Sequence, residues 1–288
     1  MTFGAQESSR QNGSPITLVM IRYGSGANNF YALTNAEQVV QHGGVEGGYK
    51  PISIKHSSIK RLITLDDTTL TLSLPSSHPM ATRWRGYPPT EVTSVVIRQG
   101  HADSNDFKVK WLGRVLGHRD VQGGVSEFVC EPRSSSLLRG GLSRNWQHGC
   151  PLLLYSQGEG LCNADKARAT REFPITAADG GRVSLGGGFN DLGAARLDYL
   201  TGMVEWRTSD GRREVRSIMA INEQGVMTLD GPVKDLNIGD TIKASWGCNH
   251  RPYAPEGDCQ RLHANIVNYG GQPLIPTENP IGIKLGSY

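Results

Sequence analysis

Hydrophobic and polar residues alternate along much of the chain. In residues 68–74 (TTLTLSL), Leu70, Leu72 and Leu74 fall on one face, whereas threonine and serine fall on the other. This period of two is typical of a strand with one buried face. Further segments alternate in the same way or are rich in β-branched and aromatic residues: 51–59, 91–98, 108–116 and 125–130. Together they predict that residues 14–131 form an antiparallel sheet curled into a barrel or sandwich.

The strand pattern returns in the second half of the chain, from Phe173 onward, and turn sequences separate its segments. The expected strands are 189–192, 202–206, 213–221, 226–229 and 241–246. We therefore predict a second, smaller β-unit that covers residues 172–247. From Cys248 onward the chain is rich in proline, glycine and asparagine and has little periodicity. Something other than a conventional core must order that last segment.

Two short stretches have helical character. Residues 35–41 (NAEQVVQ) begin with Asn35, a favourable N-terminal cap, and carry Glu37 early in the first turn. Residues 162–170 (CNADKARAT) offer Asn163 as a cap, with alanines behind it. The predicted fold class is therefore mainly β, with two short helices and an irregular C-terminal region.

The length of 288 residues allows two domains, since a domain takes roughly 100–200 residues. We expect a β-rich domain over residues 1–147 and a second domain over residues 148–288. The 36 glycines and 15 prolines fit many short elements joined by turns. The net charge of +3 and the lack of a clustered basic face give no reason to expect a specific nucleic-acid partner. The densest basic run, residues 212–216 (RREVR), is interpreted as the solvated face of a strand.

The start of the chain and its apolar runs bear on where the protein is made. Residues 1–12 are polar and lack the apolar segment of a secretory signal. The longest apolar runs, 16–21 and 151–155, are too short to span a bilayer. We therefore expect no membrane partner, and synthesis in a reducing cytoplasm. Disulfides are rare in that compartment, which favours metal or cluster ligation for the cysteines.

Four of the five cysteines form two pairs at the edges of the second β-unit. Cys150 and Cys162 are twelve residues apart, and Cys248 and Cys259 are eleven apart. If the β-unit is a compact excursion, its two ends meet, and the four thiols converge to suit either a tetrahedral zinc ion or a [4Fe–4S] cluster. The spacing matches no short ligation motif, so a disulfide pair and plain burial remain alternatives. Cys130 lies in an alternating strand and is interpreted as a core residue.

Histidines near these cysteines leave a mixed site open. His148, His250 and His263 could each replace a thiolate, although such histidines more often support the ligands or lie on the surface. Sequence signatures of enzymes, such as G-x-S-x-G, H-E-x-x-H and a Walker phosphate loop, are not found in the chain. The glycine-rich run 43–48 is not followed by a convincing helix and is interpreted as a hairpin loop. We therefore do not expect an enzyme, and we predict no catalytic residue.

Several segments, in the same order along nearly the whole chain, resemble one family. They are 7–18 (ESSRQNGSPITL), 48–59 (GYKPISIKHSSI), 128–155 (FVCEPRSSSLLRGGLSRNWQHGCPLLLY), 202–206 (GMVEW) and 247–276 with its NIVNYGGQPLIP run. The family is that of the tail hub, or baseplate hub, proteins of phages and gene transfer agents. The plan of the chain is also similar to that of the minor tail protein L of lambdoid phages.

The resemblance implies a structural virion protein of the tail tip rather than an enzyme. Residues 1–147 would be the β-rich tail-ring hub domain, and residues 148–288 the iron–sulfur domain. The implied assembly is a homotrimer between the distal tail protein and the tip or central-fibre protein, with the tape-measure protein as a further partner. Carried over by position, the ligands of a structural [4Fe–4S] cluster are Cys150, Cys162, Cys248 and Cys259. The loop 156–161, directly before Cys162, departs from the family's usual sequence.

A Cys₄ zinc site in the same scaffold is the alternative cofactor. A cell-wall-degrading tail enzyme is the alternative function, although no peptidase or lysozyme module is found in the sequence.

Overall fold

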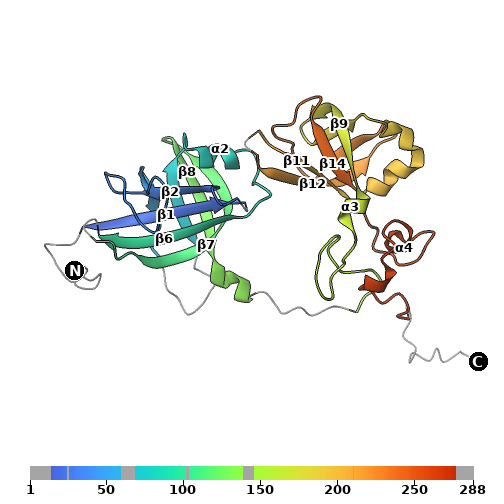
Figure 1. The fold of residues 1–288 in the computed structure, drawn as a ribbon, viewed down its shortest axis with the longest axis horizontal. Helices are drawn as coiled ribbons and strands as arrows, with labels where there is room; N and C mark the ends of the chain where they lie inside the picture. The colour runs from blue at the N-terminus through green and yellow to red at the C-terminus, as the bar shows by residue number, and fades with distance from the viewer. Residues whose placement is uncertain are drawn as a thin grey trace, which may run out of the picture. The chain divides into compact units, whose positions relative to one another are not determined.

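The computed structural model describes residues 14–24, 26–59, 69–101, 104–138, 146–209 and 211–276. Parts of two segments that carry the family resemblance, 7–13 and 139–145, lie outside these residues, as does the polar stretch 1–12. The chain divides into two compact units, Met1–Gly141 and Leu142–Tyr288 (Figure 1). Both are built mainly of strands, so the predicted mainly β fold class is confirmed. No helix among the described residues is long and apolar enough to cross a membrane.

The first unit is one eight-stranded sheet with the strand order β3-β2-β1-β6-β7-β8-β5-β4. Its neighbours pair antiparallel except β2 and β3, which are parallel. The strands are β1 (Pro15–Tyr23), β2 (Phe30–Thr34), β3 (Lys50–Pro51), β4 (Lys55–His56), β5 (Leu70–Pro75), β6 (Thr93–His101), β7 (Lys108–Val121) and β8 (Val125–Pro132). Among the residues that the structure describes, the unit also contains helix α2 (Pro79–Trp84) and the 3-10 helix η2 (Arg133–Leu138).

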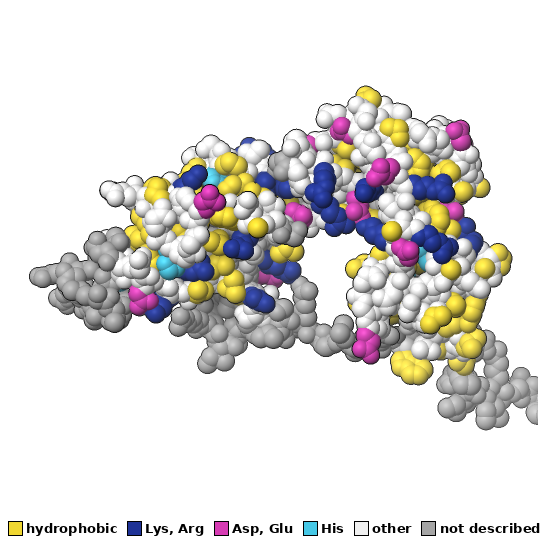
Figure 2. Space-filling model, viewed as in Figure 1, with side chains coloured by type: hydrophobic (Ala, Val, Ile, Leu, Met, Phe, Trp, Pro, Cys, Tyr) yellow, Lys and Arg dark blue, Asp and Glu magenta, His cyan; other side chains and the backbone are white. Residues whose placement is uncertain are grey.

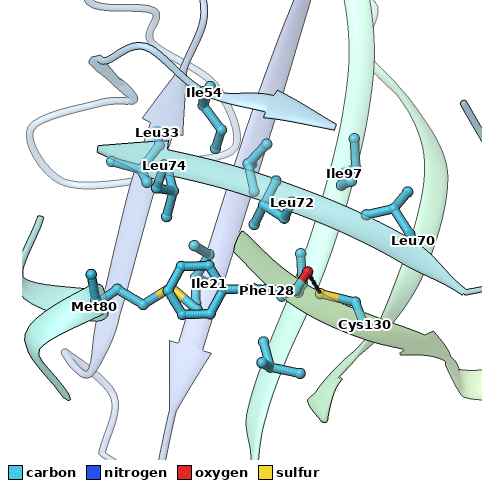
Figure 3. Close-up of a cluster of buried hydrophobic side chains, with 14 of the residues drawn as sticks. Ile21, Leu33, Ile54, Leu70, Leu72, Leu74, Met80, Ile97, Phe128 and Cys130 are labelled. Carbon is cyan, nitrogen blue, oxygen red and sulfur yellow. Dashed lines mark hydrogen bonds between the residues drawn. The ribbon is translucent and has the colours of Figure 1, made fainter. Parts of the chain in front are cut away.

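The core of the first unit follows from the alternation in its strands. Leu70, Leu72 and Leu74 of β5 are fully buried, as the period of two predicts, and they pack with Phe128 and Cys130 of β8 (Figure 3). The Sγ of Cys130 donates to the carbonyl of Phe128 at 3.6 Å. Cys130 is therefore a core residue, as its place in an alternating strand indicated.

The predicted helix over residues 35–41 is wrong. The side chain of Asn35 does not cap a helix but accepts a hydrogen bond from the backbone N–H of Thr17, at 2.7 Å, in the neighbouring strand β1. This contact between residues far apart in sequence replaces the local cap on which the prediction rested. A helix forms instead at α2, where the Nδ1 of His78 accepts from the N–H of Met80 at 3.2 Å and Pro79 occupies the first turn.

The second unit contains a closed barrel of six antiparallel strands in the order β10-β13-β12-β11-β14-β9. The strands are β9 (Thr170–Asp179), β10 (Arg182–Leu185), β11 (Met203–Arg207), β12 (Arg213–Ile221), β13 (Val226–Leu229) and β14 (Thr241–Ser245). Short helices lie before, within and after it: α3 (Lys166–Ala169), η3 (Asn190–Tyr199), α4 (Asp258–Arg261) and η4 (Ile266–Asn268). Thirteen buried side chains from Phe173 to Ala244 form its core.

Two local predictions in this unit are corrected. Residues 189–192 (FNDL) lie at the start of the 3-10 helix η3 instead of in a strand, with Phe189 as the N-terminal cap and buried in the barrel core. A segment this short does not distinguish helix from strand. Only residues 166–169 of the stretch 162–170 are helical, and the cap is Asp165. Asn163 instead has φ of +53° and accepts from the N–H of Gly158 at 2.8 Å, closing a turn.

The basic run 212–216 is not the solvated face of a strand. Arg212, Glu214 and Arg216 are 7%, 1% and 9% exposed, because alternate residues of β12 face the barrel interior. Glu214 lies between the two arginines, 3.7 Å from Arg212 and 3.5 Å from Arg216. Only Arg213 of the run's arginines faces outward, where it pairs with Glu205 at 3.0 Å. The barrel thus carries a buried ion-pair network, which requires both signs of charge to remain in place.

Candidate cofactor site

The four candidate ligands come from two segments that flank the barrel. We call residues 146–165 and 246–276 the cysteine-bearing loops. Cys150 and Cys162 lie in the first segment, Cys248 follows β14, and Cys259 lies in α4. Strands β9 and β14 are neighbours in the barrel, with Thr170 opposite Ser245. The barrel therefore brings together the two points at which the chain enters and leaves it, which brings the two loop segments together as well.

All four cysteines line one cavity. Its other lining residues are Leu152, Leu154, Ala164, His250, His263, Asn265 and Asn268. Cys248 and Cys259 are buried, and Cys150 and Cys162 are half-buried. None of the four forms a disulfide. The structure thus joins all four predicted cysteines at a single place, although they span more than a hundred residues of sequence.

The sulfur atoms accept hydrogen bonds from groups of the same loops. The backbone N–H of Gly270 donates to the Sγ of Cys150, and that of His250 to the Sγ of Cys248, both at 3.4 Å. The side-chain amide of Asn265 donates to the Sγ of Cys162 at 3.8 Å. N–H donors of this kind stabilise negative charge on sulfur and orient metal ligands.

Asn265 links two of the cysteines. Its side chain also donates to the carbonyl of Cys162, its N–H donates to the carbonyl of Cys259 at 2.8 Å, and its own carbonyl accepts from the Cys259 thiol at 3.3 Å. Asn268 in turn donates to the Asn265 side chain at 2.7 Å. Sequence reasoning did not identify Asn265 as a site residue, although Asn265 is the first residue of the NIVNYGGQPLIP run that carries the family resemblance.

Burial and mutual proximity affect the ionisation of the thiols. Burial raises the pKa of Cys259 to about 12, and negative charge on Cys248, Cys150 and Cys162 would raise it further. Burial likewise raises the pKa of Cys248 to about 11, against the lowering effect of the His250 N–H. Four thiolates at this place therefore need a compensating positive charge, which a metal centre supplies.

Two of the three nearby histidines line the cavity and also tie the loops together. The Nε2 of His263 lies 2.8 Å from the carbonyl of Gly247, and the Nδ1 of His250 lies 2.7 Å from the carbonyl of Cys150. His148 is exposed and does not line the cavity; its carbonyl accepts from the hydroxyl of Tyr269 at 2.6 Å. His250 and His263 thus hold backbone segments in place, as supporting histidines do.

Glycines allow the close backbone approaches around the site. A Cβ at Gly271 would lie 2.6 Å from the carbonyl oxygen of His148, and a Cβ at Gly247, beside Cys248, would collide with the carbonyl of Leu200. The first contact packs Gly271 against the first loop segment, and the second packs Gly247 against the end of η3, without a layer of side chains between the backbones.

The cysteines do not surround a single point closely. Among the described residues, no group of three or more His, Cys, Asp or Glu side chains is arranged to hold one metal ion. A tetrahedral zinc site needs four sulfurs about 2.3 Å from one ion. The four thiols, with the N–H groups that donate to three of them, form the donor set of a thiolate-ligated centre.

Two comparisons with known proteins agree with the phage resemblance: a match to a sequence family and a match to a solved structure. Residues 198–279, less than half of the chain, match the family described as "Phage conserved hypothetical protein BR0599". That segment includes Cys248 and Cys259. No curated protein sequence matches the chain. Among solved structures, a chain of the "Virion of native gene transfer agent (GTA) particle" has the same fold, with a TM-score of 0.70 and 15% sequence identity. The match covers 96% of this chain and 92% of that one, so both units are shared.

Proposed function

We propose that this protein is a structural component of a phage-type virion, a baseplate hub at the tail tip. The observation that carries the proposal is the fold match over both units to a gene transfer agent virion chain. The family match over residues 198–279 supports it independently, since that family is described from phages. The role is architectural rather than enzymatic: the protein would join the distal tail ring to the tip or fibre protein.

The proposed assembly is a homotrimer that also contacts the tape-measure protein. Light scattering on the purified chain should give three times the monomer mass of 31.3 kDa. Immunogold labelling of intact particles with an antibody against the chain should mark one end of the tail. Labelling spread over the capsid would contradict the tail-tip location.

The proposed cofactor is a structural [4Fe–4S] cluster held by Cys150, Cys162, Cys248 and Cys259. Support comes from the shared cavity and from the N–H donors to Cys150, Cys162 and Cys248. When bound, the cluster supplies four iron–thiolate bonds, which cross-link the loops on either side of the barrel. The chain's own residues position the sulfurs and bury Cys248 and Cys259. A Cys₄ zinc ion is the competing cofactor, and it would require the four sulfurs to move toward one point.

Anaerobic purification followed by metal analysis tests the cofactor directly. We expect about four irons per chain and a broad visible absorption band from the thiolate-ligated cluster. The variant Cys248→Ser should lose most of the iron, whereas Cys130→Ser, a matched change in the first unit, should keep it. One zinc per chain and no visible absorption would show that the cofactor is a zinc ion instead of the cluster. A metal-free, stably folded protein would refute ligation altogether.

A further inference from the structure

A second site lies in the first unit, on the face of the sheet opposite the core that contains Cys130. The pocket has a volume of about 500 Å³, within the usual range for ligand sites. Strands β1, β2 and β6 and the loop between β2 and β3 form it. The residues lining it are Met20, Arg22, Asn28, Phe30, His42, Gly43, Gly44, Val45, Glu46, Tyr49 and Arg98.

Two arginines point positive charge into this pocket without a carboxylate partner. Arg22 and Arg98 lie on the paired strands β1 and β6. The Nε of Arg22 donates to the Sδ of Met20, and the Nη1 of Arg98 donates to the hydroxyl of Tyr49, both at 3.4 Å. Within the described part of the chain, neither guanidinium forms an ion pair. A thioether and a phenol leave most of the ten guanidinium N–H donors available.

The positive charge of the arginines affects the pKa values of His42 and Tyr49. Burial lowers the pKa of His42, and the positive charge of Arg98 lowers it further. Burial raises the pKa of Tyr49, while both Arg98 and Arg22 oppose that rise. Both arginines therefore act at the same point, beside the Tyr49 hydroxyl. Glu46 is the one carboxylate among the lining residues; it is exposed and pairs with neither arginine.

The rest of the wall is apolar. Met20, Phe30 and Val45 belong to a hydrophobic cluster that also includes Tyr49 and Phe107. The ligand that fits this wall and these donors is an anion carried on an apolar body. Guanidinium groups bind carboxylates through paired hydrogen bonds, and an apolar neighbour on the ligand would cover the wall.

We propose that the pocket binds a carboxylate of a partner polypeptide, with an apolar side chain of the same segment against Met20, Phe30 and Val45. This site is independent of the cysteines and goes beyond the hub role. A nucleic-acid backbone suits it less well, because phosphate tracks bind along stripes of basic residues, whereas this is an isolated pocket with an apolar wall.

Three dipeptides, all blocked at the amino end, test the proposal on the full chain. The first contains phenylalanine and aspartate with an amidated end, the second has asparagine in place of aspartate, and the third is the asparagine peptide with a free chain end. We expect saturable binding of the first or third in titration calorimetry and at least tenfold weaker binding of the neutral second. Comparison of the first and third shows whether a side-chain or a chain-end carboxylate is preferred. Binding should weaken as salt is raised.

Variants connect the binding to the two arginines. Arg22→Gln and Arg98→Gln should each weaken binding of the acidic peptide about tenfold or more. Arg98→Lys keeps the charge but loses the planar guanidinium, so it should weaken this binding less. Arg119→Gln is the matched control, because Arg119 lies in the same unit and already pairs with Glu127 at 2.6 Å. Arg22→Gln leaves the Tyr49 hydrogen bond intact, so it separates binding from any effect on folding.

Two results would overturn the proposal. Equal affinity for the acidic and neutral peptides, or no change in the two Arg→Gln variants, would leave a merely apolar pocket. Tighter binding of inorganic phosphate or of a short DNA duplex than of any peptide, lost in the same variants, would assign the pocket to a phosphate-bearing ligand instead.

Discussion

The barrel and the cysteine-bearing loops belong to the same unit, but their interiors differ. The barrel closes on itself with every strand paired, around thirteen buried hydrophobic side chains. The loops contribute Tyr155 and Ala164 to a small buried cluster that also includes Ala169 of α3. Several of their large apolar side chains are exposed: Trp146, Leu153, Tyr253, Val267 and Leu274. Figure 2 shows hydrophobic side chains at the surface of the region that holds α4 in Figure 1.

The difference shows what each region depends on. Strand pairing and apolar burial are enough to define the barrel. The loops have too little buried apolar surface for that, so hydrogen bonds to sulfur and backbone atoms, and the proposed cluster, must supply their order. Substitutions in the loops should therefore act through ligation, and substitutions in the barrel through packing and buried charge.

The largest expected effect comes from removing a ligand. Cys248→Ser should unfold residues 146–165 and 246–276 while leaving the first unit's sheet intact, since a structural metal site contributes on the order of 10 kcal/mol to folding. Hydrogen exchange resolved by peptide would show fast exchange in the loops and unchanged protection in β5 and β8. Cys130→Ser serves as the control. Loops as protected in Cys248→Ser as in the native protein would show that ligation does not order them.

The barrel should respond most to loss of its buried carboxylate. Glu214→Gln removes the negative charge that lies between Arg212 and Arg216, both of which are buried. Breaking a buried pair costs roughly 3–5 kcal/mol, so the free energy of unfolding of the second unit should fall by about that amount. Urea unfolding followed by the fluorescence of Trp206, which packs near Arg216, measures it.

Glu172→Gln is the matched control in the same barrel. Glu172 pairs with Lys243 at 3.4 Å on the surface, and both side chains are mostly exposed. Such surface ion pairs contribute about 0–1 kcal/mol to the free energy of unfolding. Equal effects of the two substitutions would contradict the view that the charge network is part of the barrel interior.

Alternation in the sequence predicted the strands well but not which set of strands closes. It favours a barrel or sandwich over residues 14–131, whereas the closed barrel lies in the second unit and the first unit holds an eight-stranded sheet. The leucines of β5 indicated their buried face directly, because one face of that strand packs on a single core. The same alternation in β12 was interpreted as solvated, since charged residues at 212–216 mask an interior face. The helix expected at 35–41 failed because Asn35 bonds to Thr17, a partner that no local pattern reveals.

The cysteine site was predictable in part, for a physical reason. Both pairs flank a β-unit, and a unit whose first and last strands pair must bring its flanking segments together. The residues that bond to the sulfurs could not be predicted in the same way. Asn265 and Gly270 reach them through turns of irregular chain, and irregular chain has no period from which a side chain's direction can be inferred.

A smaller effect is expected when a sulfur's hydrogen-bond donor is removed. Asn265→Ala eliminates the amide that bonds to the Sγ and carbonyl of Cys162. Loss of such supporting groups typically costs about 10–100-fold in metal affinity. Iron release to a chelator, followed by the visible absorption, should therefore be faster by at least tenfold. Asn249→Ala, in the same loops, should not change it, because that side chain bonds to Glu256, Arg251 and Asp258 and not to a sulfur.

The smallest expected effect concerns the link between the loops and the barrel. The hydroxyl of Tyr155 donates to the carbonyl of Trp246 at 2.6 Å, at the residue after β14. Burial raises the pKa of Tyr155, so the hydroxyl keeps its proton and remains a donor. Tyr155→Phe removes this hydrogen bond but keeps the ring against His263, whose centroid is 5.6 Å away. One such bond contributes about 0.5–1.5 kcal/mol.

We expect Tyr155→Phe to speed amide exchange in residues 150–162 modestly, to leave the iron content unchanged, and to leave the protection of β11 and β12 as in the native protein. This pattern would mean that the loops and the barrel are separate cooperative regions joined by a few bonds at β14. If the substitution instead lowered the protection of the barrel strands as much as that of the loops, the two regions would unfold together. The contrast between a barrel with its own core and loops ordered by ligation would then be wrong.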